Sequence, residues 1–209
     1  MVRKMSKLMM MIPLVFVFAS QQHASAQTNV VEETIQYECT ATVLGLITEN
    51  FTMPVTIESI VPTSVAPGEE SSGTDSTATV EIPEDTVDRF QNELNWNAVT
   101  GEVDLFELHS QNLDDTVNVA DPPLAIPDTE IPESGDLVFT VPEGDGVEAG
   151  PFTAGQEGEV LISAGDISAE LTSSSGGLPF PVDAECEPME EVDGEPQDLT
   201  IAEIPIEQD

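Results

Sequence analysis

Basic residues are almost missing from this chain of 209 residues, which contains 41 Asp and Glu but only 4 Lys and Arg. Three of the four bases, Arg3, Lys4 and Lys7, stand within the first seven residues, and only Arg89 follows them. A surface of nearly uniform negative charge repels nucleic-acid phosphates and anionic lipid headgroups. The composition therefore argues against nucleic-acid binding and against electrostatic binding to membranes.

The side chains that most active sites use are scarce as well, with 2 His, 1 Tyr, 1 Trp and 2 Cys. No G-x-S-x-G elbow, phosphate loop or H-E-x-x-H helix occurs. His109 stands next to Ser110, but neighbouring residues on a strand point to opposite faces, so the pair is poorly placed for nucleophilic catalysis and we expect an exposed His109. We predict that the protein is not an enzyme and assign no catalytic residue. A secreted, glycosidase-like hydrolase is the alternative, since that chemistry needs only two of the many carboxylates.

Residues 1–26 have the pattern of a secretory signal peptide. The early bases precede an apolar run from Leu8 to Ala19, and Ala24-Ser25-Ala26 forms a small-x-small cleavage site before Gln27. The run is shorter than the roughly 20 residues that a membrane-spanning helix needs. We therefore expect a secreted protein, extracellular or associated with the cell envelope, with no membrane anchor after cleavage. Cleavage would leave 41 acids against one base and no lysine.

Cys39 and Cys186 are the two cysteines of the chain. In an exported protein a pair of cysteines predicts one structural disulfide. Buried free thiols or a two-ligand metal site are the alternatives. Zinc is poorly supported because its structural sites take four nitrogen or sulfur ligands.

Apolar residues alternate with polar ones along most of the chain beyond residue 30, the pattern of half-buried strands. Predicted strands cover about 33–45, 51–57, 78–82, 99–108, 115–120, 137–141, 160–164, 167–171, 180–186 and 199–206. The polar segment 61–77 and the proline-rich segment 121–135 are predicted to cross between strands, and Gly165-Asp166 is predicted to turn a hairpin.

One segment has helical rather than strand spacing. Val87, Phe90 and Leu94 fall on one helical face, and two acids precede them in the first turn. The fold class that accommodates these elements is all-β: an antiparallel Greek-key, immunoglobulin-like β-sandwich with one short helix near residues 84–94. We predict a single such domain over residues 31–207.

Several motifs together resemble an uncharacterised domain of secreted proteins of Gram-positive bacteria, best known from actinobacteria. They are Tyr37-x-Cys39, Pro132-x-Ser134-Gly135-x-Leu137, Gly158-x-Val160-x-Ile162-x-x-Gly165, the strand that ends at Cys186, and Leu199-x-Ile201-x-x-Ile204. The resemblance covers nearly all of the chain after the signal peptide. It implies a secreted, disulfide-closed β-sandwich, and it brings no activity, cofactor or site residue with it.

Two weak ligand sites are suggested by residue type. Trp96, between two asparagines, is the best candidate for an exposed aromatic platform, but packing in the core is the favoured interpretation because a large ring is usually mostly buried. Calcium binds about six to eight oxygen ligands, and the acidic turns that hold Asp114, Asp115, Glu143 and Asp145 supply carboxylates. We expect no resident cofactor beyond loosely bound Ca²⁺.

The function that best fits this composition is that of a secreted, highly acidic, non-catalytic interaction or structural module. Its partner would be an unidentified extracellular or cell-envelope component, and a calcium-dependent binding module is a further alternative. Nothing in the composition indicates an oligomeric state.

Overall fold

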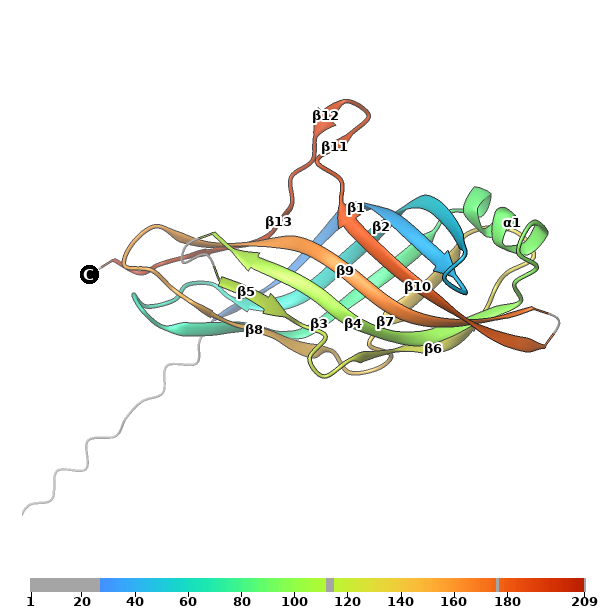
Figure 1. The fold of residues 1–209 in the computed structure, drawn as a ribbon. Helices are drawn as coiled ribbons and strands as arrows, with labels where there is room; N and C mark the ends of the chain where they lie inside the picture. The colour runs from blue at the N-terminus through green and yellow to red at the C-terminus, as the bar shows by residue number, and fades with distance from the viewer. Residues whose placement is uncertain (1–26, 112–114, 176, 209) are drawn as a thin grey trace, which may run out of the picture.

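The computed structural model describes residues 27–111, 115–175 and 177–208 (Figure 1). The predicted signal peptide therefore lies outside the described residues, as does Asp114. The elements, in chain order, are β1 (Thr28–Val43), β2 (Ile47–Pro62), β3 (Glu70–Ile82), α1 (Glu84–Asn92), β4 (Ala98–Ser110), β5 (Asp115–Asn118), β6 (Leu124–Glu130), β7 (Leu137–Val141), β8 (Val147–Thr153), β9 (Glu159–Ser175), β10 (Leu178–Pro188), β11 (Glu191–Val192), β12 (Glu195–Pro196) and β13 (Thr200–Pro205).

Eleven strands form one antiparallel sheet, whose main path runs β5-β4-β9-β10-β1-β2-β3-β7. Three further strands pair beside this path: β6 with β4, β8 with β3, and β13 with β9. The sheet folds over itself, because β6 contacts β7 and β5 contacts β8 although these strands lie at opposite ends of the path. The result is an elongated sandwich with its long strands nearly along its length (Figure 1). The predicted all-β class is confirmed.

Alternation of buried and exposed positions explains why these segments are strands. In β1, Ile35, Tyr37, Cys39, Ala41 and Val43 are buried while Glu38 between them is exposed. The same alternation in β2, β3, β4 and β10 sends the apolar side chains into a single core cluster. Acidic side chains at the intervening positions stay in water, where their charge is solvated.

Helix α1 is the one helix among the described residues, and its place at Glu84–Asn92 confirms the predicted helix near 84–94. Val87 and Phe90 are buried on its inner face. Arg89 on its last turn approaches the Glu49 carboxylate at 3.8 Å and donates a hydrogen bond to the Asn50 carbonyl. The helix thus closes one end of the sandwich over the turn side of β2.

The predicted hairpin turn at Gly165-Asp166 is wrong, because β9 runs without a break from Glu159 to Ser175. Both long neighbours of β9 pair along it, β4 on one side and β10 on the other. A Cβ atom at residue 165 would collide with His109 and Glu107 of β4. The glycine therefore marks a close approach between strands rather than a turn.

Two predicted crossings also contain strands. The second half of the polar segment 61–77 belongs to β3, where it pairs with β8, a strand that the sequence pattern did not indicate. The proline-rich segment includes β6, which pairs with β4 at the sheet margin. Prolines are tolerated there because a strand with one free edge leaves part of its N–H groups outside the ladder.

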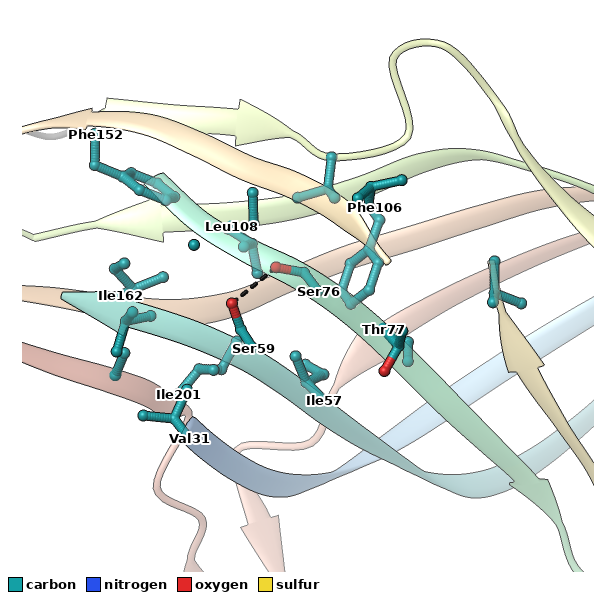
Figure 2. Close-up of a pocket in the computed structure, with 18 of the residues that line it drawn as sticks. Val31, Ile57, Ser59, Ser76, Thr77, Phe106, Leu108, Phe152, Ile162 and Ile201 are labelled. Carbon is teal, nitrogen blue, oxygen red and sulfur yellow. Dashed lines mark hydrogen bonds between the residues drawn. The ribbon is translucent and has the colours of Figure 1, made fainter. Parts of the chain in front are cut away.

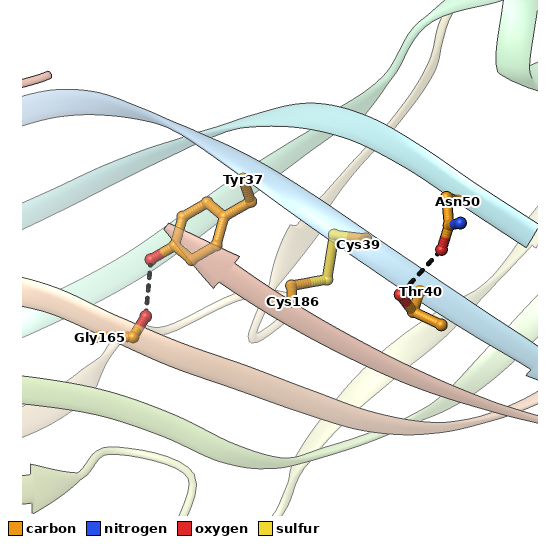
Figure 3. The surroundings of a disulfide bond; sticks show 6 residues. All are labelled: Tyr37, Cys39, Thr40, Asn50, Gly165 and Cys186. Atoms are coloured by element: carbon orange, nitrogen blue, oxygen red, sulfur yellow. Dashed lines mark hydrogen bonds between the residues drawn. A yellow bond between two sulfur atoms is a disulfide. The ribbon is translucent and has the colours of Figure 1, made fainter. Parts of the chain in front are cut away.

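Cys39 and Cys186 face each other across β1 and β10 and form a disulfide (Figure 3), which confirms the predicted pairing. Their Cα atoms are 4.1 Å apart, and the two residues are separated by 147 positions in sequence. The bond therefore joins a strand from the start of the chain to one near its end. Such a return of a late strand to the first is the long connection typical of Greek-key folds.

We expect the Cys39→Ser/Cys186→Ser variant to melt at a clearly lower temperature than the unchanged protein under oxidising conditions. Opening so long a loop restores denatured-state entropy worth up to roughly 5 kcal/mol in the chain-entropy model. Thermal unfolding followed by circular dichroism measures the effect, and the unchanged protein in excess reductant is the control that should behave like the variant. Equal melting temperatures would show that the disulfide does not stabilise the folded protein.

Candidate functional site

The interior of the sandwich contains three apolar cavities that lie between its two faces. The inner cavity, of about 30 Å³, lies between Ser59, Leu108 and Phe152 (Figure 2). The middle cavity, of about 80 Å³, is lined only by apolar side chains, among them Met53 and Ala184. The outer cavity, of about 40 Å³, lies beside Phe90 and is also lined only by apolar side chains.

The three cavities share their walls and so form one row. Phe106 lines both the inner and the middle cavity. Phe51 and Leu171 line both the middle and the outer cavity. Neighbouring cavities thus share parts of their lining.

The inner cavity has the only polar wall of the row. Ser59 on β2 and Ser76 on β3 are buried there, and their hydroxyl oxygens are 2.8 Å apart in a hydrogen bond (Figure 2). One hydroxyl donates to the other, which lowers the cost of burying the pair. The inner cavity is therefore weakly polar, whereas the middle and outer cavities are not.

Trp96 forms the end wall of the row. Trp96 is only 4% exposed, which agrees with packing in the core and contradicts the alternative of an exposed aromatic platform. The indole stacks on Phe90 with ring centroids 4.5 Å apart and also contacts Phe180 at 5.8 Å. Phe90 in turn meets Phe51 edge to face at 5.6 Å. Helix α1 supplies Phe90, whose ring packs against the indole. The residues next to Trp96 in sequence do not indicate this contact.

A surface hollow of about 490 Å³ lies on the other side of Trp96. Trp96 and Ile131 line this hollow and also the outer cavity. The remaining lining residues are Gln91, Asn95, Asn97, Ala98, Glu130 and Glu133. Two buried apolar side chains, Trp96 and Ile131, thus lie between a hollow with a mostly polar lining and the apolar interior row.

His109 and Ser110 lie as the strand pattern predicts. The His109 side chain is 42% exposed, its Nε2 is 3.9 Å from a Glu107 carboxylate oxygen, and its Nδ1 is 3.0 Å from the Thr116 hydroxyl. Ser110 points the other way and is buried, and among the described residues its hydroxyl has no hydrogen-bond partner. The two side chains do not meet, so no Ser–His pair exists there.

Tyr37, the chain's one tyrosine, is fully buried on β1 and donates a hydrogen bond to the Gly165 carbonyl, 3.1 Å away (Figure 3). Burial raises the pKa of the Tyr37 phenol far above its usual value, and the Asp166 carboxylate raises it further. The buried phenol therefore keeps its proton to a higher pH than an exposed tyrosine would. Its position favours a packing role, because it joins β1 to β9 across β10.

The acidic turns give no metal centre in the part of the chain that is described. Glu143 and Asp145 are in the turn between β7 and β8, Asp115 begins β5, and Asp114 is outside the described residues. No three His, Cys, Asp or Glu side chains of the described ranges are grouped so that they could hold a metal ion. The calcium site stays a prediction.

Two turns at one end of the sandwich expose large apolar side chains. Leu44 and Leu46, in the turn between β1 and β2, are 57% and 85% exposed, and Leu178 at the start of β10 is 73% exposed. The N–H of Leu44 donates to the Pro181 carbonyl, so the two turns belong to neighbouring strands. We name Leu44, Leu46, Ile47 and Leu178 the apolar tip.

No helix within the described ranges has the length and apolar character needed to cross a bilayer.

The sequence profile of DUF6801, described as a family of unknown function, matches residues 36–202. No curated protein and no solved structure matches the chain. The matched range begins inside β1 and ends inside β13, so it includes both cysteines and every lining residue of the middle and outer cavities, whereas Val31 of the inner cavity precedes it.

We expect the protein to lose stability as the pH rises above about 10, the usual pKa of tyrosine. An unfolded chain ionises its tyrosine there while the buried Tyr37 keeps its proton, so the free energy of unfolding is unaffected below that pH and falls above it. Because the chain has one tyrosine, phenolate absorbance reports the ionisation of Tyr37 alone. This absorbance should rise together with the loss of the circular dichroism signal.

The matched variant is Tyr37→Phe, which loses one buried hydrogen bond, worth about 1 kcal/mol at neutral pH, and should lose this alkaline dependence. Phenolate that forms near pH 10 in the folded protein would contradict the assignment.

We expect NaCl and CaCl2 at equal ionic strength to raise the melting temperature equally, because both screen repulsion among the carboxylates. Thermal melting in the two salts measures this. An increase in melting temperature at CaCl2 concentrations well below about 1 mM would instead indicate a specific calcium site in that turn. The double variant Glu143→Gln/Asp145→Asn should then abolish that increase.

Proposed function

The chain belongs to DUF6801, a family of unknown function, and from its structure we propose that it is a secreted, non-catalytic interaction module. It would act in the extracellular space or cell envelope of a Gram-positive bacterium, after removal of residues 1–26. The disulfide supports export, because such bonds persist in oxidising compartments. The separation of His109 from Ser110 and the apolar interior support a role without catalysis.

The observation that carries the proposal is the apolar tip. Large aliphatic side chains in two neighbouring turns stand in water on a molecule whose other surface is crowded with carboxylates. Exposed apolar clusters on soluble proteins mark contact surfaces, because they are covered when a partner binds. The tip is therefore the surface that we assign to the partner.

Charge sets the chemistry of that partner. Arg89 is the one base in the described ranges, and it lies beside Glu49 near the tip rather than free in solution. A partner with an apolar centre and a rim of Lys or Arg would meet both the leucines and the surrounding acids, and its approach would be accelerated by the negative field. We infer a basic extracellular or envelope protein.

A photoreactive amino acid in place of Leu46 should give a discrete crosslinked product in the native exporting host. The same substitution at Val138, which is 52% exposed on β7 and does not belong to the tip, is the matched control and should give none. Gel mobility and mass spectrometry identify the product, and sequencing of the secreted protein should find Gln27 as its first residue.

Equal products from both positions, or none from Leu46, would refute the tip as a contact surface. A protein that keeps Met1 and stays inside the cell would refute export.

A further inference from the structure

The surface hollow beside Trp96 has the size of a ligand site, since its volume is about 490 Å³ and ligand pockets typically measure about 300–1,000 Å³. Two of its lining residues, Trp96 and Ile131, are apolar and buried, whereas Glu130 and Glu133 are exposed. The hollow can therefore take a guest that combines an apolar stem with a polar end.

The polar side chains of the hollow offer a guest more hydrogen-bond acceptors than donors. The Gln91 amide nitrogen already donates to the carbonyls of Ile131 and Pro132. Asn95 uses one of its two N–H donors on the Ser175 hydroxyl, which is 2.9 Å away. The two carboxylates of the hollow can only accept hydrogen bonds when they are ionised. The lining therefore favours a guest that donates several hydrogen bonds.

The two carboxylates of the hollow have no cation of their own chain beside them. No Lys, Arg or His lines the hollow, and within the described ranges neither Glu130 nor Glu133 forms a salt bridge. Arg89 of the neighbouring helix approaches Glu49 and donates to the Asn50 carbonyl instead. Because like charges surround the hollow, a positively charged group is attracted to it.

Backbone hydrogen bonds fix the two connections that border the hollow. The N–H of Trp96 donates to the Phe90 carbonyl at 3.0 Å. The N–H of Asn97 donates to the Ser174 carbonyl at 2.9 Å, and the Asn97 carbonyl accepts from Ile131 at 3.0 Å. The backbone around the hollow is thus held in place before a guest arrives, so that binding costs little ordering of the chain there.

The hollow and the apolar tip are connected through the ends of β9 and β10. Ser175 of β9, whose hydroxyl accepts from Asn95, is the register partner of Leu178 in the tip. The Leu44 N–H of the tip donates to the Pro181 carbonyl of β10. Helix α1 lies at the end of the sandwich where β9 ends and β10 begins (Figure 1). One partner can therefore cover the tip and also fill the hollow.

We propose that the surface hollow binds a lysine or arginine side chain of the basic partner that covers the apolar tip. The inference rests on the proposed function and gives the partner a defined anchoring group. The aliphatic stem of that side chain lies against Trp96 and Ile131. Its charged end donates to the carboxylates of Glu130 and Glu133 and to the amide oxygen of Gln91.

A titration with a short peptide tests the hollow without the partner. The probe is acetyl-glycyl-lysyl-glycine amide, and its control is the same peptide with norleucine in place of lysine. Trp96 is the one tryptophan of the chain, so we expect saturable shifts of its indole N–H resonance in the isotope-labelled secreted protein. The norleucine peptide should bind about tenfold more weakly, and NaCl should weaken binding of the lysine peptide by screening the carboxylates. No saturable shift, or equal affinity for both peptides, would overturn the proposal.

The double variant Glu130→Gln/Glu133→Gln removes both charges of the hollow and keeps the shape of the side chains. It should bind the lysine peptide about tenfold more weakly. The matched control Glu191→Gln/Glu195→Gln removes the same charge from exposed positions of β11 and β12 and should bind like the unchanged protein. All four glutamates are exposed, so the circular dichroism spectra should agree. Equal weakening in both variants would mean that the peptide responds to net charge alone and would overturn the proposal.

Crosslinking from position Leu46 distinguishes a failure of the hollow from a failure of the apolar tip. A crosslinked product that decreases in Glu130→Gln/Glu133→Gln and persists in Glu191→Gln/Glu195→Gln supports both surfaces. A product that persists equally in the two variants overturns the role of the hollow and leaves the tip as the contact surface. Saturable binding of the lysine peptide without any product from Leu46 supports the cationic site and refutes the tip.

Discussion

Between β1 and β10 the sheet joins residues from opposite ends of the chain, and Cys39 is covalently bonded to Cys186 where the two strands meet. Each of these strands has a second partner, β2 on one side and β9 on the other, so the pair connects the two halves of the sheet. Without this pairing the meander β1–β3 and the group of β4, β9 and β13 would be separate open sheets. Tyr37 adds to the junction, because its hydroxyl bonds to Gly165 on β9.

The same junction places the cavity row. The middle cavity lies under Cys186 and Ala184 of β10, and it continues on one side to Phe51 of β2 and on the other to Leu171 of β9. Small residues such as Ala184 and Ala169 leave room between the faces that larger aliphatic side chains would fill. These small side chains thus leave space between the two faces of the folded sheet, and the aromatic cluster around Trp96 packs at one end of that space.

Charge acts on the whole molecule rather than at one point. The exposed positions of the strands carry most of the acids, and their mutual repulsion opposes compaction. The disulfide and the continuous apolar core oppose that repulsion. The proposed contact surface follows from the contrast, because the exposed leucines of the apolar tip stand on an otherwise acidic surface.

Much of the fold was predictable because its signals are local. Alternation in β1 and helical spacing in α1 depend only on neighbours in sequence, and two cysteines in an exported chain have one way to pair. The break expected at Gly165 was wrong because a glycine has the same signature whether it turns the chain or admits a neighbouring strand. Strand β8 was missed for a similar reason, since a short segment with Pro151 and Gly150 becomes a strand only where β3 offers it partners.

The candidate site was less predictable than the fold. The sequence by itself determined the acidic exterior, the strand periodicity, the helix and the one available disulfide, because each follows from residue type and local spacing. Only the tertiary structure decided that Trp96 is buried against Phe90, that three cavities line up behind it, and that Leu46 and Leu178 share one end. These features arise where side chains from β2, β4, β9 and β10 meet, and distances between segments so far apart in the chain exist only once the sheet has closed.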